Sequence, residues 1–131
     1  MREIKFRGKI IDEGYKYGEW VKGSGIKISK SGSVIIYDEI SCQWYEVDPE
    51  TVGQYIGRKD RNGKEIYEKD IINFGGAINY IVIWADGFYF AFYYKSIADD
   101  EVFVLEKQEC EELEVIGNIF DNPELLPGKK Y

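Results

Sequence analysis

The sequence predicts a mainly β fold: a small partly closed barrel or sandwich of antiparallel hairpins with one or two short helical turns. Apolar and polar residues alternate with a period of two over much of the chain, and few segments show the helical period of 3.6. Turn-forming pairs such as Asn62-Gly63 separate the alternating runs. The 131 residues suit a single domain spanning 1–131, long enough to bury a core without disulfides.

The first third of the chain predicts several short strands. Ile4, Phe6 and Ile10 alternate with basic residues, which indicates a strand that buries these three side chains on one face. Glycines then divide residues 14–28, where we expect short strands joined by a loop. Residues 32–39 and 42–47 are two further predicted strands, separated by turn-forming residues.

Residues 47–74 combine a helix start with a hairpin. Asp48 precedes Pro49 and Glu50, a pattern typical of one capped helical turn. Residues 54–60 and 64–74 are predicted strands on either side of Asn62-Gly63. Asn-Gly favours the tip of a hairpin, because a type I′ turn requires positive φ at both central residues.

A second hairpin is predicted from residues 77–84 and 88–96, with its turn at residues 85–87. Its return strand is apolar or amphipathic on both faces. Phe88, Phe90, Phe92 and Tyr94 share one face, and Tyr89, Ala91 and Tyr93 share the other. Such a strand is either central and covered on both sides, or it presents one face to a partner subunit or ligand.

The last part of the chain is acidic. Residues 101–106 and 113–120 are predicted strands, and Asn122-Pro123-Glu124 repeats the capping pattern. The net charge of −7 is concentrated between Asp99 and Glu114, where only Lys107 is basic. The acids are Asp99, Asp100, Glu101, Glu106, Glu109, Glu111, Glu112 and Glu114. This segment either keeps a surface solvated or attracts a basic partner, and it would repel a nucleic-acid backbone.

Three stretches carry a family resemblance. They are "MREIKFRGK", "VDPETVGQYIGRKDRNGKEIYEKDIINF" and "VIGNIFDNPELL", in this order along the chain. Together they resemble the YopX-like family of small phage and prophage proteins. The resemblance implies a mainly β, intracellular and phage-related protein with a capacity for self-association, and it identifies no catalytic residue. The sequence departs from the family pattern at Lys69, where a glycine before Asp70 is expected, and this weakens the prediction of a tight turn there.

The composition excludes several kinds of chemistry. The chain has no histidine and two separated cysteines, Cys42 and Cys110, so neither a zinc site nor a Ser-His or Cys-His pair is expected. The acids around Cys110 should raise its pKa, and both thiols are expected to be unreactive. No glycine-rich phosphate loop is present. The apolar runs are too short to span a membrane, so we expect a cytoplasmic protein. Because these catalytic and phosphate-binding patterns are missing, we expect neither a cofactor nor enzymatic activity.

These observations favour a non-enzymatic accessory factor that binds an unidentified host or phage protein or assembles with itself. The expected interaction residues are those of the aromatic face, together with Asp99, Asp100, Glu101, Glu111 and Glu112. The alternative is a nucleic-acid-binding hairpin with Arg58, Lys59, Arg61 and Lys64 around its tip and Tyr55 and Tyr67 on its arms. An acidic nucleic-acid mimic and a metal-dependent hydrolase are weaker alternatives.

Overall fold

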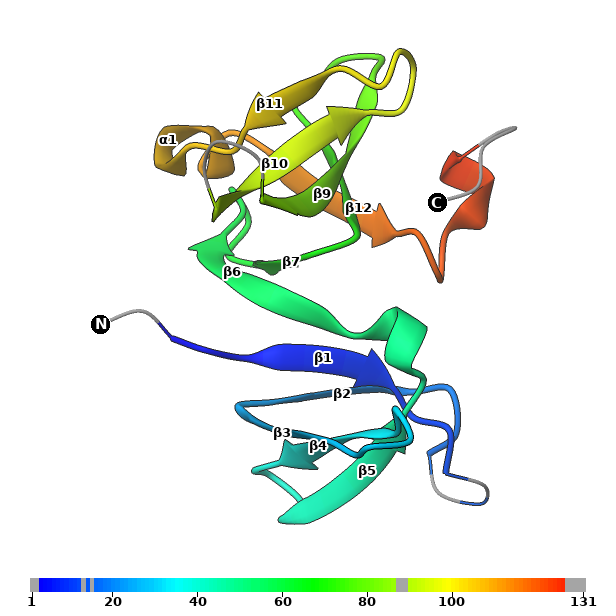
Figure 1. The fold of residues 1–131 in the computed structure, drawn as a ribbon. Helices are drawn as coiled ribbons and strands as arrows, with labels where there is room; N and C mark the ends of the chain where they lie inside the picture. The colour runs from blue at the N-terminus through cyan, green and yellow to red at the C-terminus, as the bar shows by residue number, and fades with distance from the viewer. Residues whose placement is uncertain (1–2, 13, 15, 87–89, 127–131) are drawn as a thin grey trace. The chain divides into compact units, whose positions relative to one another are not determined.

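The computed structural model describes residues 3–12, 14, 16–86 and 90–126 (Figure 1). The chain forms two compact units, Met1–Tyr55 and Ile56–Tyr131. The described strands form three antiparallel sheets, none of which closes into a barrel, and the helical segments are short. The prediction of a mainly β fold built from antiparallel hairpins with short helical turns is therefore confirmed.

The described residues of the first unit form five complete strands, one helical turn and the start of a further strand. The complete elements are β1 (Phe6–Lys9), β2 (Trp20–Gly23), β3 (Gly25–Ile28), β4 (Val34–Asp38), β5 (Gln43–Val47) and η1 (Pro49–Thr51). Strands β3, β4 and β5 form one antiparallel sheet, while β1 pairs with β2 and with the first residues of β6 (Gly53–Lys59). Strand β6 also pairs with β7 (Glu65–Tyr67), which completes a four-stranded sheet in the order β2-β1-β6-β7.

The first unit buries its own apolar core. Its members are Ile10, Val21, Val34, Ile36, Tyr45 and Val47, with Phe6, Ile26 and Val52 packed against them. Gly23 is required where β2 passes close to β4, because an added Cβ would lie 1.8 Å from the carbonyl oxygen of Tyr37. A side chain cannot approach a backbone oxygen so closely, so even alanine would force this part of the unit apart.

The predicted N-terminal strand is present, but its burial differs from the expectation. Ile4 lies before β1 and is 56% exposed, whereas Arg7 is only 7% exposed. The guanidinium carbon of Arg7 lies 4.6 Å from the centroid of the Trp20 ring. Stacking of the planar guanidinium on indole allows a charged residue to occupy a buried position that the alternation assigned to the solvent face.

The predicted helical turn at Pro49 is confirmed together with its cap. The Asp48 carboxylate accepts a hydrogen bond from the backbone N–H of Glu50, at 3.0 Å. Thr51, which is buried, accepts a hydrogen bond from the N–H of Lys9 at 2.8 Å and donates one to the carbonyl of Asp48 at 2.7 Å. The turn is therefore fastened to the end of β1 by a threonine hydroxyl.

The second unit is built on a five-stranded antiparallel sheet in the order β11-β10-β9-β8-β12. Its elements after β7 are β8 (Asp70–Asn73), β9 (Asn79–Asp86), β10 (Phe90–Ser96), β11 (Val102–Val104), α1 (Lys107–Cys110), β12 (Glu114–Asn118) and η2 (Pro123–Leu125). A register shift between Val115 and Gly117 interrupts the pairing of β12 with β8. The predicted hairpin is confirmed as the pairing of β9 with β10, but Ala85 and Asp86, which were expected in its turn, belong to β9, and residues 87–89 lie outside the described residues.

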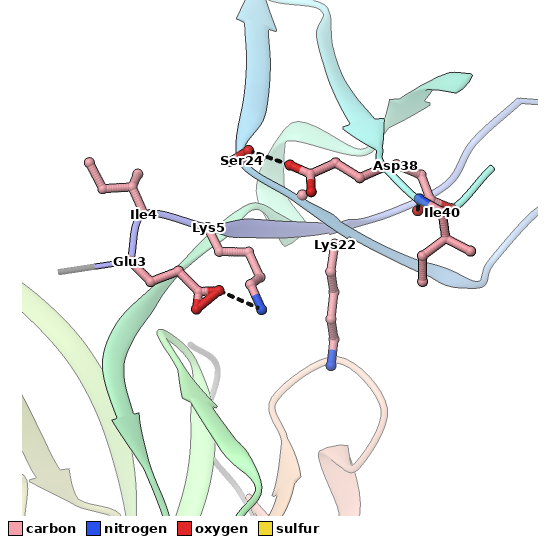
Figure 2. Close-up of a pocket in the computed structure, with 9 residues that line it drawn as sticks. Glu3, Ile4, Lys5, Lys22, Ser24, Asp38 and Ile40 are labelled. Atoms are coloured by element: carbon pink, nitrogen blue, oxygen red, sulfur yellow. Dashed lines mark hydrogen bonds and ion pairs between the residues drawn. The ribbon is translucent and has the colours of Figure 1, made fainter. Parts of the chain in front are cut away.

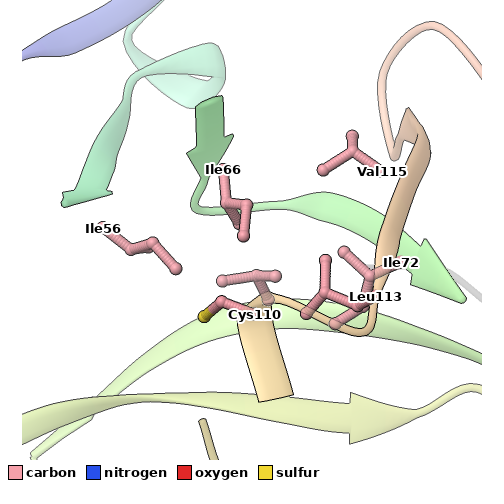
Figure 3. Packing of buried hydrophobic residues seen from close by; sticks show 7 residues of the cluster. Ile56, Ile66, Ile72, Cys110, Leu113 and Val115 are labelled. Carbon is pink, nitrogen blue, oxygen red and sulfur yellow. The ribbon is translucent and has the colours of Figure 1, made fainter. Parts of the chain in front are cut away.

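Two apolar clusters give the second unit its core. Figure 3 shows the larger one, in which strand residues meet Cys110 and Leu113 from α1 and the segment after it. Its buried members are Ile56, Ile66, Ile72, Val82, Cys110, Leu113 and Val115. The other cluster is formed by Ile71, Ile81 and Leu126. Consecutive residues Ile71 and Ile72 contribute to different clusters because side chains alternate across a strand.

The hairpin at Asn62-Gly63 is confirmed, but its turn is not type I′. Gly63 has φ of 83°, whereas Asn62 is not among the described residues with positive φ. The N–H of Gly63 bonds the carbonyl of Asp60, and the N–H of Asp60 bonds the carbonyl of Lys64. This pattern is that of a three-residue loop, a type I turn followed by a glycine bulge.

The predicted strand 64–74 is interrupted by a tight turn. It consists of β7 and β8, and between them Lys69 has φ of 69°. The carboxylate of Asp70 accepts a hydrogen bond from the N–H of Tyr67 at 2.8 Å, which closes the turn. Lys69, which weakened the prediction of a tight turn, does not prevent one, because these local hydrogen bonds outweigh the backbone preference of lysine.

Two features near the C-terminus also differ from expectation. The helix α1 was not predicted; at its start the Glu109 carboxylate accepts a hydrogen bond from the N–H of Glu106 at 3.1 Å. The predicted turn η2 is present, but Asn122 does not cap it. The side chain of Asn122 instead accepts a hydrogen bond from the N–H of Asn118 at 3.1 Å, because β12 ends within its reach.

Candidate functional site

The basic hairpin tip is exposed but does not combine basic and aromatic groups on its surface. Arg58, Lys59, Arg61 and Lys64 are all exposed. Tyr55 and Tyr67 are 5% and 0% exposed, so neither ring is available to stack on a base. Nη2 of Arg61 lies 2.6 Å from Oε2 of Glu114, so one of the basic side chains forms an ion pair with a carboxylate of the same unit. The aromatic part of the nucleic-acid hypothesis was therefore wrong.

Asp60 organises the hairpin loop from a buried position. Its carboxylate accepts hydrogen bonds from the backbone N–H groups of Asn62 at 2.8 Å, Lys64 at 2.9 Å and Val115 at 2.9 Å. Burial alone would raise the pKa of Asp60, but the three donors outweigh it, and the pKa lies below its ordinary value. The residue has a structural explanation and needs no catalytic role.

A pocket of about 420 Å³ opens in the first unit (Figure 2). Its lining includes Glu3, Ile4, Lys5, Lys22, Gly23, Ser24, Asp38, Glu39 and Ile40. Many of its polar groups bond one another. Nζ of Lys5 lies 3.2 Å from Oε1 of Glu3, and the Ser24 hydroxyl donates to Oε1 of Glu39 at 2.7 Å. The lining contains both acids and lysines, so it has no charge of a single sign.

A second pocket, of about 360 Å³, lies in the second unit and is lined by aromatic rings and acids. The rings come from the residue after β8 and from β9, β10 and β11, and the acids come from α1 and the segment after it. The lining residues are Phe74, Tyr80, Tyr94, Phe103, Glu109 and Glu112. We call it the aromatic pocket.

The four rings of the aromatic pocket pack on one another. Tyr94 lies at the centre, with its ring centroid 5.3 Å from that of Phe74, 5.1 Å from Tyr80 and 5.2 Å from Phe103. The Tyr80 and Tyr94 rings meet edge to face, and the Tyr94 and Phe103 rings are stacked. These separations fall within the range of favourable aromatic pairs, so the rings form one connected wall.

Glu109 is fixed at this wall by Tyr94. The Tyr94 hydroxyl donates a hydrogen bond to Oε2 of Glu109 at 2.5 Å. Burial and this carboxylate raise the pKa of Tyr94 above its ordinary value, so the phenol keeps its proton at neutral pH. Glu112 is exposed at the same pocket. The pocket therefore presents two carboxylates beside aromatic rings.

The structure brings only some of the predicted interaction residues to a common site. Phe88 lies outside the described residues, and Phe90 and Phe92 are placed on β10 without a description of their side chains. Tyr94 is half-buried and packs against the larger core cluster, yet it also lines the aromatic pocket. The core interpretation of the aromatic face therefore holds in part for Tyr94, and the interface interpretation stays a prediction.

The acidic residues lie on either side of β11 along the chain. Asp99, Asp100 and Glu101 are exposed in the connection from β10, and Glu111 and Glu112 are exposed after α1. Figure 1 shows the connection and α1 at opposite ends of β11. Sequence reasoning missed Phe74, Tyr80 and Phe103, because only the strand pairing shows that they join Tyr94. Phe103 pairs with Tyr94 across β11 and β10, for example.

The two cysteines do not form a disulfide: Cys42 is exposed and Cys110 is buried. Burial raises the pKa of Cys110 to about 11, and Glu109 and Glu111 add to this effect while Arg58 opposes it. The raised pKa that was expected for Cys110 is confirmed, with burial rather than the acids as its main cause. A thiol of this pKa is almost entirely protonated at neutral pH and is a poor nucleophile.

In residues 3–12, 14, 16–86 and 90–126, no group of three or more acidic, histidine or cysteine side chains is arranged to hold a metal ion. Within the same part of the chain, no helix has both the length and the apolar character needed to cross a membrane.

Comparison with known proteins identifies the family. A family model described as YopX protein matches residues 5–127. The chain belongs to the YopX family. The match spans residues of both compact units, so the family's characteristic sequence extends over almost the whole chain. The resemblance drawn from the three sequence stretches is confirmed at the level of the family.

The fold of this YopX-family chain is also found in a solved structure. It is the crystal structure of protein EF1440 from Enterococcus faecalis, with 22% sequence identity and a TM-score of 0.59. The match covers 96% of this chain and 99% of that one. Comparison with curated proteins gave no match. The likeness to the solved structure shows the fold alone.

Proposed function

We propose that this YopX-family protein is a non-enzymatic accessory factor, encoded by a phage or prophage and acting in the host cytoplasm. It binds a basic host or phage protein through the acidic surface of its second unit. The observation that carries this proposal is that Asp99, Asp100 and Glu101 are exposed before β11 and that Glu111 and Glu112 are exposed after α1, with Glu112 at the aromatic pocket; we call these five residues the acidic surface.

The charge of this surface supports a basic partner. Between Asp99 and Glu114 the chain has eight acids and one base, Lys107. A surface of one sign accelerates encounter with an oppositely charged protein and disfavours partners of like charge. The aromatic pocket adds apolar area beside this charge, and aromatic residues are enriched at protein interfaces.

The basic hairpin supports a nucleic-acid partner less well. Its two tyrosines are buried, and Arg61 is paired with Glu114. The remaining exposed bases supply charge alone, whereas binders of single strands combine charge with stacking. A nucleic-acid partner is therefore an outcome that the experiment has to separate from a protein partner.

The test is capture of partners from host cells with nuclease treatment, comparing two triple variants. Asp99→Asn, Glu101→Gln and Glu111→Gln remove three exposed charges from the acidic surface. Glu19→Gln, Glu50→Gln and Glu124→Gln remove three exposed charges elsewhere. We expect a nuclease-resistant basic protein that the first variant loses and the second retains. Recovery that depends on nucleic acid, or equal capture by both variants, would overturn the proposal.

A further inference from the structure

The aromatic pocket has a chemistry that the overall charge of the surface does not explain. Four of its six lining residues are aromatic and the other two are glutamates, so no basic side chain is among them. The pocket in the first unit is different, because Lys5 and Lys22 lie among its acids. The lining of the aromatic pocket therefore combines aromatic rings with two acids and no basic side chain, in contrast to the pocket of the first unit.

This combination favours an organic cation. The faces of phenol and phenyl rings carry partial negative charge and attract an ammonium or guanidinium group within about 6 Å. Glu109 and Glu112 add full negative charges at the same place. A metal ion would need several oxygen ligands, whereas most of this lining is carbon. An uncharged apolar group would gain no electrostatic attraction from the two carboxylates.

The pocket is held in shape before a ligand arrives. Tyr94 contacts the other three rings, and its hydroxyl bonds Glu109. Glu109 also accepts the N–H of Glu106 at the start of α1, at 3.1 Å. Phe74, Tyr80 and Tyr94 pack against the larger core cluster of the unit. Because core packing fixes these groups, little conformational freedom remains to be lost when a ligand binds.

We propose that the aromatic pocket binds the cationic end of a lysine or arginine side chain from a basic protein partner. This inference rests on the proposed function and names the group that the acidic surface recognises. The cation lies against the ring faces beside Glu109 and Glu112, and the hydrocarbon part of the side chain packs on Phe103, which is 41% exposed.

The test uses three small probes and NMR of the full chain. N-acetyl-lysine methylamide and N-acetyl-arginine methylamide carry the cation, and N-acetyl-norleucine methylamide matches the lysine chain without its charge. We expect at least one cationic probe to shift the resonances of Tyr80, Tyr94 and Phe103, and the norleucine probe to shift them much less. Equal binding of all three, or shifts confined to other residues, would overturn the inference.

Two variants test the pocket without disturbing the core. Glu112→Gln removes an exposed charge, and Phe103→Leu removes a partly exposed ring while keeping an apolar side chain. Each should weaken the cationic probe by about threefold, in line with one exposed ion pair or one cation–π contact. Unchanged probe affinity in both variants would place the cation elsewhere and overturn the inference.

The outcomes separate this inference from the proposed function. If the acidic-surface triple variant loses the captured partner but no cationic probe binds the pocket, the inference fails and the proposed function stands. If a cationic probe binds the pocket while the triple variant keeps every partner, the proposed function fails and the cation specificity of the pocket stands. Loss of the captured partner by Phe103→Leu or Glu112→Gln supports both.

Discussion

Lys69 occupies a backbone conformation that favours glycine. Its φ is 69°, in the turn between β7 and β8. Both backbone groups are engaged, since the N–H bonds the carbonyl of Val82 at 2.7 Å and the carbonyl accepts the N–H of Ile119 at 3.1 Å. These bonds hold the residue in place although a Cβ is unfavourable in the left-handed region. A change to glycine relieves this strain without altering the fold.

We expect Lys69→Gly to be more stable than Lys69→Ala by about 1 kcal/mol. Both substitutions remove the ammonium that lies 5.5 Å from the centroid of the Phe120 ring. The difference between the free energies of unfolding of the two variants therefore reports the cost of a Cβ in the left-handed conformation. Urea unfolding of the two variants measures it. Equal midpoints would show that the left-handed conformation is not maintained at this position.

Asp60 stabilises the hairpin through charge as well as geometry. Three backbone N–H groups lose their acceptor if the carboxylate is removed, and Asp60 itself is 6% exposed. Because the pKa of Asp60 is lowered in the folded protein, its ionised form contributes stability above the ordinary pKa of 3.8. That contribution is lost as the pH falls through the lower folded value.

We predict that Asp60→Ala lowers the free energy of unfolding at pH 7 by about 3 kcal/mol, through backbone donors left without an acceptor. Denaturant unfolding between pH 7 and pH 2 should show the difference from the unsubstituted protein constant down to about pH 5 and shrinking below about pH 4. Asp99→Asn, at an exposed carboxylate, is the control and should show little effect. A difference independent of pH would contradict the role of the charge.

Strand β11 is an edge strand with exposed apolar side chains. It stands at one end of the five-stranded sheet, and Val102, Phe103 and Val104 are 49%, 41% and 44% exposed. Such an edge is a template for pairing with another chain. If two copies paired in antiparallel fashion about Phe103, Asp100 of one would oppose Glu106 of the other. Like charges in opposition disfavour this association.

Neutralising these acids should therefore promote self-association through β11. We expect the double variant Asp100→Asn and Glu106→Gln to show a higher average mass by light scattering at equal concentration. Asparagine tolerates the φ of 60° at position 100, so the turn is preserved. Glu50→Gln with Glu124→Gln makes the same charge change elsewhere and should leave the mass unchanged. An unchanged mass in both variants would contradict this role of the acids.

At the scale of the whole molecule, the two compact units each have a core of their own, and the candidate surfaces belong to different units. The first unit contains the pocket of mixed charge, and the second contains the basic hairpin tip, the acidic residues and the aromatic pocket. The proposed function therefore depends on features of the second unit. The hairpin, the acidic segment and Tyr94 were predicted from the sequence, whereas the other three rings of the pocket were not.

The sequence by itself determined the features that depend on neighbouring residues. Alternation, Asn62-Gly63 and the Asp48-Pro49 pair predicted strands, a hairpin tip and a capped turn, because each reflects the local backbone preferences of a few consecutive residues. The acidic segment and the family resemblance were likewise visible in the sequence. Strand existence could be predicted because a period of two is imposed by the backbone itself.

The tertiary structure alone decided which side chains are buried and which meet. Arg7 is buried where Trp20 on the adjacent strand stacks on it, and Tyr67, expected on the surface of the hairpin, is 0% exposed. Phe74, Tyr80, Tyr94 and Phe103 come together only through the pairing of separate strands and the placement of α1. Such contacts join residues that are distant in the chain, and local preference carries no information about which distant partner a side chain will find.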